Sequence, residues 1–170
     1  MNNLDIIFNR RSIRKFVPDK PVSQEDTTDL LKAAMAAPSA GNQQPWHFII
    51  ITEKGLMEKI PEFSPYSGMC RNAPLGILVC GDTLLEKYPG YWVQDCSAAV
   101  QNILLAVTAK KLGAVWTGVY PSEDRVTGFK KLLNLPEKVI PLAFLVIGHP
   151  AETPETQNRF NESRVHVNKW

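Results

Sequence analysis

The sequence predicts a single α+β domain that spans residues 1–170. Three apolar runs of strand length, at residues 47–52, 75–80 and 141–148, are separated by segments with helical periodicity. The expected strands and helices do not alternate strictly, which favours α+β packing over a parallel doubly wound sheet. With 170 residues, 44% of them hydrophobic, the chain is long enough to bury one core.

The first third of the chain is expected to hold two helices and one strand. Residues 4–11 form a short helix with one apolar face. A second helix is expected to begin after Ser23, whose hydroxyl can cap it, with Asp26 three residues on as a variant of the capping box. Pro38 is expected to end this helix, and residues 47–52 then form a buried strand.

The middle of the chain predicts a helix near residues 54–60, a surface loop over 61–73 and a strand at 75–80. The loop is expected because this stretch contains two prolines and a glycine and shows no period. Residues 91–112 form the longest expected helix, which ends at Gly113. This helix is apolar on more than one face, so it is expected to lie centrally and to face a partner subunit as well.

The last third is expected to contain a strand at residues 114–119, a helix from Ser122 to Leu133 and a core strand at 141–148. The segment 151–170 differs, because it has few apolar residues and no helical stripe. An arm of this kind cannot bury itself alone. It is expected either to be disordered or to lie along another surface, such as that of a partner subunit.

Bulk properties argue against several classes of protein. The net charge is +2 and the basic stretches are short, which argues against a nucleic-acid-binding face. The cysteines Cys70, Cys80 and Cys96 show no CxxC spacing, so neither a disulfide framework nor a metal site is expected. The N-terminus lacks a signal-peptide pattern and no apolar stretch reaches membrane-spanning length, so the expected location is the cytoplasm, with no membrane partner.

Three segments carry groups suited to a phosphate and a polar ring. Residues 10–14 place three guanidiniums and a hydroxyl together, and such groups match phosphate oxygens. Residues 39–45 are rich in amides, which donate and accept hydrogen bonds, and Gly41 permits close approach of the backbone. Residues 116–121 place a glycine at a strand end, where backbone N–H groups become accessible. Each segment alone is typical of an ordinary turn or loop.

Together, in order and spacing, these segments resemble the nitroreductase family over nearly the whole chain. The likeness rests on RRSIRKF at residues 10–16, PSAGNQQPW at 38–46, KLGA at 111–114, WTG at 116–118 and IGHP at 147–150. The resemblance implies a mixed, mostly antiparallel sheet flanked by helices, built as an intertwined homodimer. It also implies FMN, bound tightly but not covalently at the subunit interface, with the arm 151–170 wrapping the partner.

The resemblance assigns the phosphate and the pyrimidine edge of the flavin to a group of basic and hydroxyl side chains. In the N-terminal segment these are Arg10, Arg11, Ser12 and Arg14. Arg159 in the tail matches a basic residue that closes on the phosphate. Many family members carry a second basic residue where this chain has Gln157, so the N-terminal arginines are expected to carry more of the phosphate binding.

The flavin ring is assigned to two further segments. Pro38, Ser39 and Ala40 match a loop that reaches the flavin from the other subunit, and Asn42 matches an amide that reads the ring or the ribityl chain. The stretch that passes flavin N5 is matched by Thr117, Gly118 and Val119. Many members have a second glycine at position 119, so the valine alters the backbone expected beside N5.

The activity implied by the resemblance is the reduction of electron-poor acceptors, such as nitroaromatics or quinones. NADH or NADPH would be a transient co-substrate in a ping-pong cycle through flavin N5. No catalytic side chain is required as a general base. The sequence contains no dinucleotide fingerprint that would select one nucleotide over the other.

Alternatives within the family are an enone reductase, a reductive dehalogenase or a flavin-degrading enzyme. Residues 61–73 and 82–92 would decide among these, because they are placed to cover the site. The aromatic residues in these stretches are expected to pack rather than to stack on an acceptor: Tyr66, Tyr88, Tyr91 and Trp92. The alternative from another class is a non-catalytic flavin-binding or sensor protein.

Overall fold

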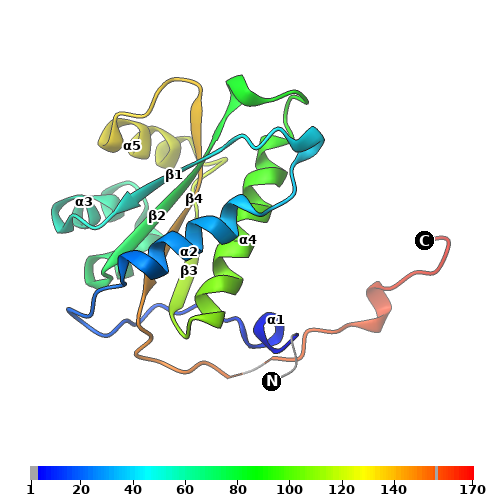
Figure 1. The fold of residues 1–170 in the computed structure, drawn as a ribbon, viewed down its shortest axis with the longest axis horizontal. Coiled ribbons are helices and arrows are strands. Elements are labelled where there is room, and N and C mark those ends of the chain that lie inside the picture. Colours follow the sequence, from blue (N-terminus) through cyan, green and yellow to red (C-terminus); the bar gives the residue numbers. More distant parts are fainter. Residues whose placement is uncertain (1–3, 156) are drawn as a thin grey trace.

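The computed structural model describes residues 4–155 and 157–170, and its centre is a four-stranded antiparallel sheet (Figure 1). The strands are β1 (Trp46–Ile51), β2 (Leu75–Asp82), β3 (Gly113–Gly118) and β4 (Val139–Gly148), in the order β1-β2-β4-β3. The two central strands, β2 and β4, are buried along nearly their whole length. Burial on both faces accounts for their continuous apolar sequences.

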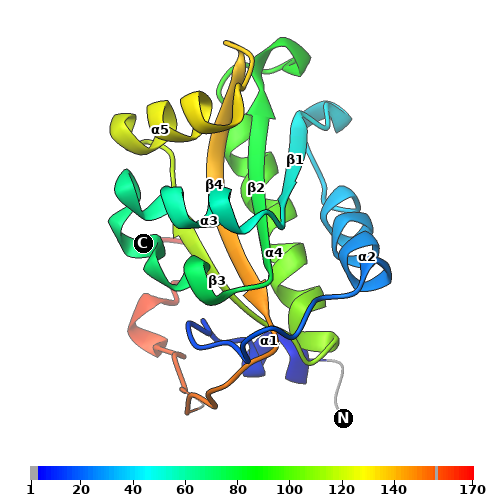
Figure 2. The ribbon, with the colours of Figure 1, turned by 90° about the vertical axis from the view of Figure 1, so that its left-hand side faces the viewer.

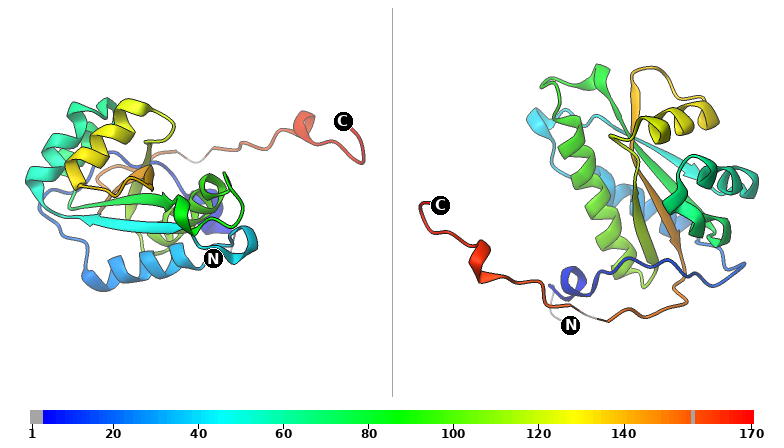
Figure 3. Two further views of the ribbon diagram at one scale, coloured as in Figure 1. Left: turned by 90° about the horizontal axis from the view of Figure 1, so that it is seen from above. Right: turned by 180° about the vertical axis from the view of Figure 1, so that it is seen from behind.

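Helices cover both faces of the sheet, as Figures 2 and 3 show. α2 (Gln24–Met35) and α4 (Trp92–Ala109) lie on one face, and α3 (Lys54–Lys59) and α5 (Glu123–Leu133) lie on the other. α1 (Asp5–Asn9) lies at the end of the sheet where β3 begins. Within the described part of the chain, no helix combines the length and the apolar character needed to cross a membrane. The expected α+β class is confirmed.

Strand alternation divides the interior into two apolar cores. Ile77 and Val79 of β2 belong to the core under α2 and α4, whereas Leu78 and Cys80 belong to the core under α3 and α5. The sheet is therefore the common wall of a three-layer sandwich, in which each helix layer buries its apolar stripe.

The N-terminal segment adds pairings at the edge of this sheet. Ser12 forms a parallel bridge with Ala114 of β3, and Phe16 forms an antiparallel bridge with Pro150 beyond β4. The four strands pair only in antiparallel fashion, and the expected mixed character is limited to this single parallel bridge beside β3. The bridge also fixes the basic residues 10–14 against the start of β3.

The longest helix ends earlier than the sequence predicts. α4 ends at Ala109 rather than at Leu112, and Lys111 then adopts a left-handed φ of 57°. Gly113 already belongs to β3 and packs closely on Ile13, so that a Cβ there would lie 2.8 Å from Ile13 Cγ2. The glycine therefore permits the contact of two segments and is not the C-cap of the helix.

Two further local predictions are wrong. Residues 61–73 are not a plain surface loop, because they contain the 3-10 helices η2 (Ile60–Glu62) and η3 (Pro65–Asn72), with the buried hydroxyls of Ser64 and Ser67 hydrogen-bonded at 2.7 Å. A 3-10 helix repeats every three residues and escapes a search for the α-helical period. β1 is a half-exposed edge strand rather than a buried one.

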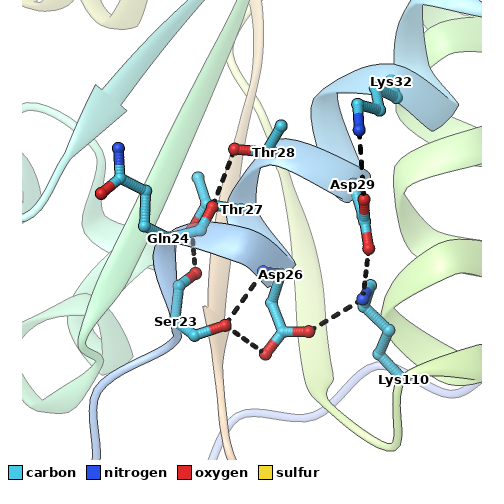
Figure 4. Close-up of polar contacts among 8 residues, drawn as sticks. All are labelled: Ser23, Gln24, Asp26, Thr27, Thr28, Asp29, Lys32 and Lys110. Atoms are coloured by element: carbon cyan, nitrogen blue, oxygen red, sulfur yellow. Dashed lines mark hydrogen bonds and ion pairs between the residues drawn. The ribbon is translucent and has the colours of Figure 1, made fainter.

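A cluster of ion pairs braces α2 against the C-terminal end of α4 (Figure 4). Lys110 Nζ lies 2.9 Å from Asp26 Oδ1 and 2.7 Å from Asp29 Oδ2. Ser23 Oγ accepts a hydrogen bond from the backbone N–H of Asp26 at 2.9 Å, which confirms the expected cap. Hydrogen bonds with Lys110 lower the pKa of both carboxyls, and the same bonds raise the pKa of the lysine.

Replacing Lys110 by methionine is expected to lower the melting temperature near neutral pH, because Asp26 and Asp29 lose their shared cation. A carboxyl whose pKa is lowered by folding adds stability above its unfolded pKa of about 4, and that stability is lost as the pH falls through the folded pKa. The difference in melting temperature between wild type and variant should therefore shrink below about pH 4.

Thermal melts across the acidic range test this expectation. Lys32→Met is the matched control, because Lys32 is more exposed and approaches Asp29 at 3.7 Å. A melting temperature of the Lys110 variant that stays below that of wild type by the same amount through the acidic range would contradict the role given to these ion pairs.

Candidate functional site

The basic N-terminal segment lies along the open edge of β3. The backbone N–H of Ile13 donates to the carbonyl of Ala114 at 2.9 Å, and the Ile13 side chain is buried. Side chains alternate along an extended segment, so Ser12 and Arg14 face outward on either side of Ile13, and both are exposed. The sequence thus folds to present a hydroxyl and a guanidinium at the sheet edge.

Arg10 and Arg159, far apart in the sequence, converge at this end of the molecule. Burial, followed by the charges of Arg159 and Arg11, lowers the pKa of the Arg10 guanidinium. These three arginines line a cavity of about 560 Å³ between α1 and the tail. A second cavity of about 270 Å³ continues from Arg10 and Arg11 toward Lys111 at the end of α4. Like charges gathered around a hollow favour the binding of an anion there.

Arg11 is held mainly by backbone carbonyls. Its Nη1 donates to Phe8 O at 2.9 Å and to Arg10 O at 2.8 Å, and its Nε donates to Glu155 O at 3.0 Å. The remaining nitrogen, Nη2, is buried without a hydrogen-bond partner among the described residues. A buried donor of this kind is costly unless a ligand or water completes it. Arg11 therefore ties α1 to the tail and retains one buried donor without a partner among the described residues.

Glu152 anchors the start of the tail to the basic segment. Its carboxylate accepts hydrogen bonds from the backbone N–H groups of Arg14, at 2.6 Å, and Lys15, at 3.1 Å. The bond from Arg14 is the main reason that the pKa of Glu152 is lowered. Further along, Gln157 Oε1 accepts from Arg159 Nη2 at 3.2 Å. Gln157 therefore orients the guanidinium of Arg159.

The end of β3 exposes one residue between two buried ones. The Thr117 hydroxyl donates to Phe144 O at 2.7 Å, and the Val119 N–H donates to Leu142 O at 3.1 Å. In an antiparallel ladder alternate residues point their N–H and C=O groups to opposite sides, so those of Gly118 point away from β4, toward the open edge. Gly118 itself is exposed, and a Cβ built on it meets nothing within 4 Å, so the space beside this residue is open.

The loop 38–44 is held by an acidic residue that the sequence analysis missed. Asp95 of α4 accepts hydrogen bonds from Ala40 N at 2.9 Å and from Gln43 Nε2 at 2.6 Å, and both side chains are buried. Gly41 and Asn42 adopt positive φ values of 53° and 54°. Asp95 is the one charged residue in the sequence of α4. A single charge in such an apolar helix could have indicated a buried carboxylate with specific partners.

The segment 82–92 lies against this loop. Gln43 Oε1 accepts hydrogen bonds from the backbone N–H groups of Lys87, at 2.8 Å, and Tyr88, at 3.2 Å. The Tyr88 ring covers Gly41, where a Cβ would lie 2.4 Å from Tyr88 Cε2. Trp92 packs in the core as expected, whereas Tyr88 and Tyr91 are about half exposed beside the loop. Their rings also pack edge to face on one another, with centroids 6.3 Å apart.

The structure does not bring all the expected site residues together in one chain. The second cavity, which continues from Arg10 and Arg11, includes Thr108 near the C-terminal end of α4. The loop 38–44 is instead hydrogen-bonded to Asp95, near the N-terminal end of this helix. At 1.5 Å per residue, these two positions lie about 20 Å apart along the helix. Figure 1 shows the same separation, with the tail and α1 at one end of α4 and the loop at the other.

Comparison with known proteins gives this arrangement a family. The model of the nitroreductase family matches residues 7–65 and 65–149, which together cover most of the chain. The chain belongs to the nitroreductase family. The family predicted from the sequence motifs is thereby confirmed.

Individual relatives agree in sequence and fold. A protein of Methanothermobacter thermautotrophicus, provisionally named an NADH dehydrogenase/NAD(P)H nitroreductase, is 52% identical over 170 residues, which cover 100% of this chain and 88% of that protein. A provisionally assigned nitroreductase of Desulfovibrio desulfuricans, solved in complex with FMN, is 31% identical with a TM-score of 0.86, covering 100% of this chain and 99% of the other. The Vibrio harveyi NADPH:FMN oxidoreductase, solved with NAD+, is 25% identical with a TM-score of 0.88, covering 100% and 78%.

Proposed function

We propose that this nitroreductase-family protein binds FMN and uses it to carry electrons from NADH or NADPH to small electron-poor acceptors, such as nitroaromatics or quinones. The observation that carries the proposal is the convergence of Arg10 and Arg159 at one end of an open sheet edge whose other end is the exposed Gly118. Two relatives support it, one solved with FMN and the other, an NADPH:FMN oxidoreductase, with NAD+.

The donor set fits a phosphorylated polar ring. Arg10, Arg14 and Arg159 supply guanidiniums, Ser12 supplies a hydroxyl, and Arg11 contributes its one uncommitted buried nitrogen. Ser12 pairs with Ala114, and Gly118 follows four residues along the same strand, about 13 Å further at 3.3 Å per residue. The ribityl phosphate of FMN is a chain of comparable reach. We therefore assign the phosphate to the arginines and the ring to the far end of β3.

Among residues 117–119, Gly118 faces the ring, and its backbone N–H is the hydrogen-bond donor. Thr117 and Val119 hold it in place through their bonds to β4 and do not themselves face the opening. When bound, FMN supplies the redox chemistry at N5, accepting a hydride from the nucleotide and passing electrons to the acceptor.

We infer that the site is completed by a second subunit. The loop with Pro38, Ser39, Ala40 and Asn42 leads into β1, which lies at the opposite edge of the sheet from β3, so a partner copy is needed to bring such a loop to a ring at the open edge of β3. The tail extends away from the body in Figures 1 and 3. It exposes large apolar side chains that a partner surface would bury: Phe160, Val165, Val167 and Trp170.

An anaerobic titration tests the proposed function. The protein is reconstituted with FMN, freed of excess and mixed with NADH or with NADPH. We expect the flavin absorbance to bleach and to return when a quinone or a nitroaromatic is added. A chain that retains no FMN would overturn the proposal, and a flavin that neither nucleotide bleaches would leave a binding protein without this reductase activity.

A further inference from the structure

One arginine outside the phosphate site contacts the end of β3. Arg125, in the first half of α5, donates from Nη1 to the carbonyl oxygen of Gly118 at 2.8 Å. The guanidinium carbon of the same residue lies 5.4 Å from the ring centroid of Tyr66 in η3. Both contacts come from elements that the family motifs do not include. They join α5 and η3 to the residue assigned to the redox ring.

The hydrogen bond from Arg125 decides which polar group of Gly118 is free at the open edge of β3. The C=O and N–H of Gly118 point toward the same open edge, because the neighbouring residues direct theirs to β4. A free carbonyl there would present its negative end at the opening, beside the N–H that is to act as donor. The Arg125 guanidinium donates a hydrogen bond to that carbonyl oxygen. The N–H is therefore the polar group of Gly118 that remains free to donate at the open edge. Arg125 also places a permanent positive charge at this edge.

We propose that Arg125 is a positioning residue for the redox site, which orients the Gly118 peptide and favours the electron-rich state of the bound cofactor. This inference rests on the proposed function, because it needs FMN at the edge of β3. A cation close to the ring offsets the negative charge that arrives with electrons, in a setting partly shielded from water. Removing it should lower the midpoint potential of the flavin and slow its reduction by the nucleotide.

The Tyr66 ring contacts the guanidinium that bonds to Gly118. A cation over an aromatic face is attracted by the ring quadrupole, and the ring also limits the positions that the guanidinium can take. Tyr66 is 74% exposed, so it contributes little to the core, and its position is better explained by this contact. The segment 61–73 thus reaches the rim of the site through one side chain.

The test compares FMN-loaded wild type with Arg125→Met, Arg125→Gln and Arg125→Lys. The readouts are the FMN dissociation constant, the midpoint potential and the single-turnover rate of reduction by NADH. Loss of a hydrogen bond to a charged group predicts a rate about tenfold lower in Arg125→Met, with a lower potential. Arg125→Lys should restore the potential in part, and Arg125→Gln, which can donate without a charge, should keep the lower potential.

Arg71→Met is the control for loss of one exposed arginine elsewhere, and it should match wild type. Tyr66→Leu should lie between wild type and Arg125→Met, whereas Tyr66→Phe should stay close to wild type. A wild type that binds no FMN would overturn the proposed function and this inference with it. A wild type that binds FMN, beside an Arg125→Met or Arg125→Gln variant with unchanged potential and rate, would overturn the inference alone.

Discussion

Asp95→Ala is expected to lower the free energy of unfolding by about 2–4 kcal/mol and to weaken FMN binding. The carboxylate is buried and each of its oxygens accepts one hydrogen bond, from Ala40 N and from Gln43 Nε2. Truncation leaves two donors without a partner and frees the loop 38–44 from α4. Because Gln43 also accepts from Lys87 and Tyr88, the segment 82–92 loosens with it.

Asp95→Asn keeps the shape of the side chain but removes its negative charge and one of its two acceptor oxygens. An amide has one acceptor oxygen, so its NH₂ group would face one of the two donors, and we expect about half of the loss seen with alanine. Urea unfolding followed by circular dichroism measures both variants. Asp124→Ala, which removes an exposed carboxylate on α5, is the matched control and should change stability by less than about 0.5 kcal/mol. An Asp95→Ala variant as stable as this control would refute the assignment.

Arg10→Met is expected to raise the FMN dissociation constant about tenfold to about 100-fold, because a charged hydrogen bond contributes about 1.5–3 kcal/mol. The same change should not lower the stability of the protein without FMN. Burial and the charges of Arg159 and Arg11 lower the pKa of this guanidinium, which means that its charge is disfavoured until an anion arrives. Weaker binding of FMN without a loss of stability is the signature of a side chain that serves an anion site.

Fluorescence titration with FMN at two salt concentrations measures this effect. Affinity of the wild type should fall as salt rises, and the variant should show a weaker dependence. Arg71→Met removes an exposed arginine and is the matched control, with FMN affinity expected to equal that of wild type. Equal FMN affinity for the Arg10 variant and this control would contradict the phosphate assignment.

Much of the fold could be predicted because it depends on local signals. The cap of α2 is encoded by Ser23 and Asp26, which form the expected hydrogen bond. The two central strands are buried on both faces, so their sequences are continuous apolar runs. The helix α2 ends at Met35, shortly before Pro38, as the proline suggested. Each of these features is decided by residues that are neighbours in the chain.

The rest depends on contacts between distant segments. The end of α4 at Ala109 is set by the packing of Gly113 on Ile13, about a hundred residues earlier in the chain. The tie of Arg11 to Glu155 and that of Gln43 to Asp95 likewise join segments that periodicity cannot relate. The motifs therefore predicted which segments form the site. They did not predict that Arg11 donates hydrogen bonds to backbone carbonyls. They also did not predict that, among residues 117–119, Gly118 alone faces the open edge of β3.

In the proposed dimer, one FMN site takes its arginines from one subunit and its loop from the other. Mixed dimers of an Arg10→Met chain and an Asn42→Gly chain test this most directly, and the glycine keeps the positive φ of position 42. If the site is shared, each mixed dimer contains one site with both residues intact. We expect that mixing two weakly binding variants restores wild-type FMN affinity at one site per dimer. Mixed dimers with no restored site would contradict it, because arginine and loop would then act within one chain.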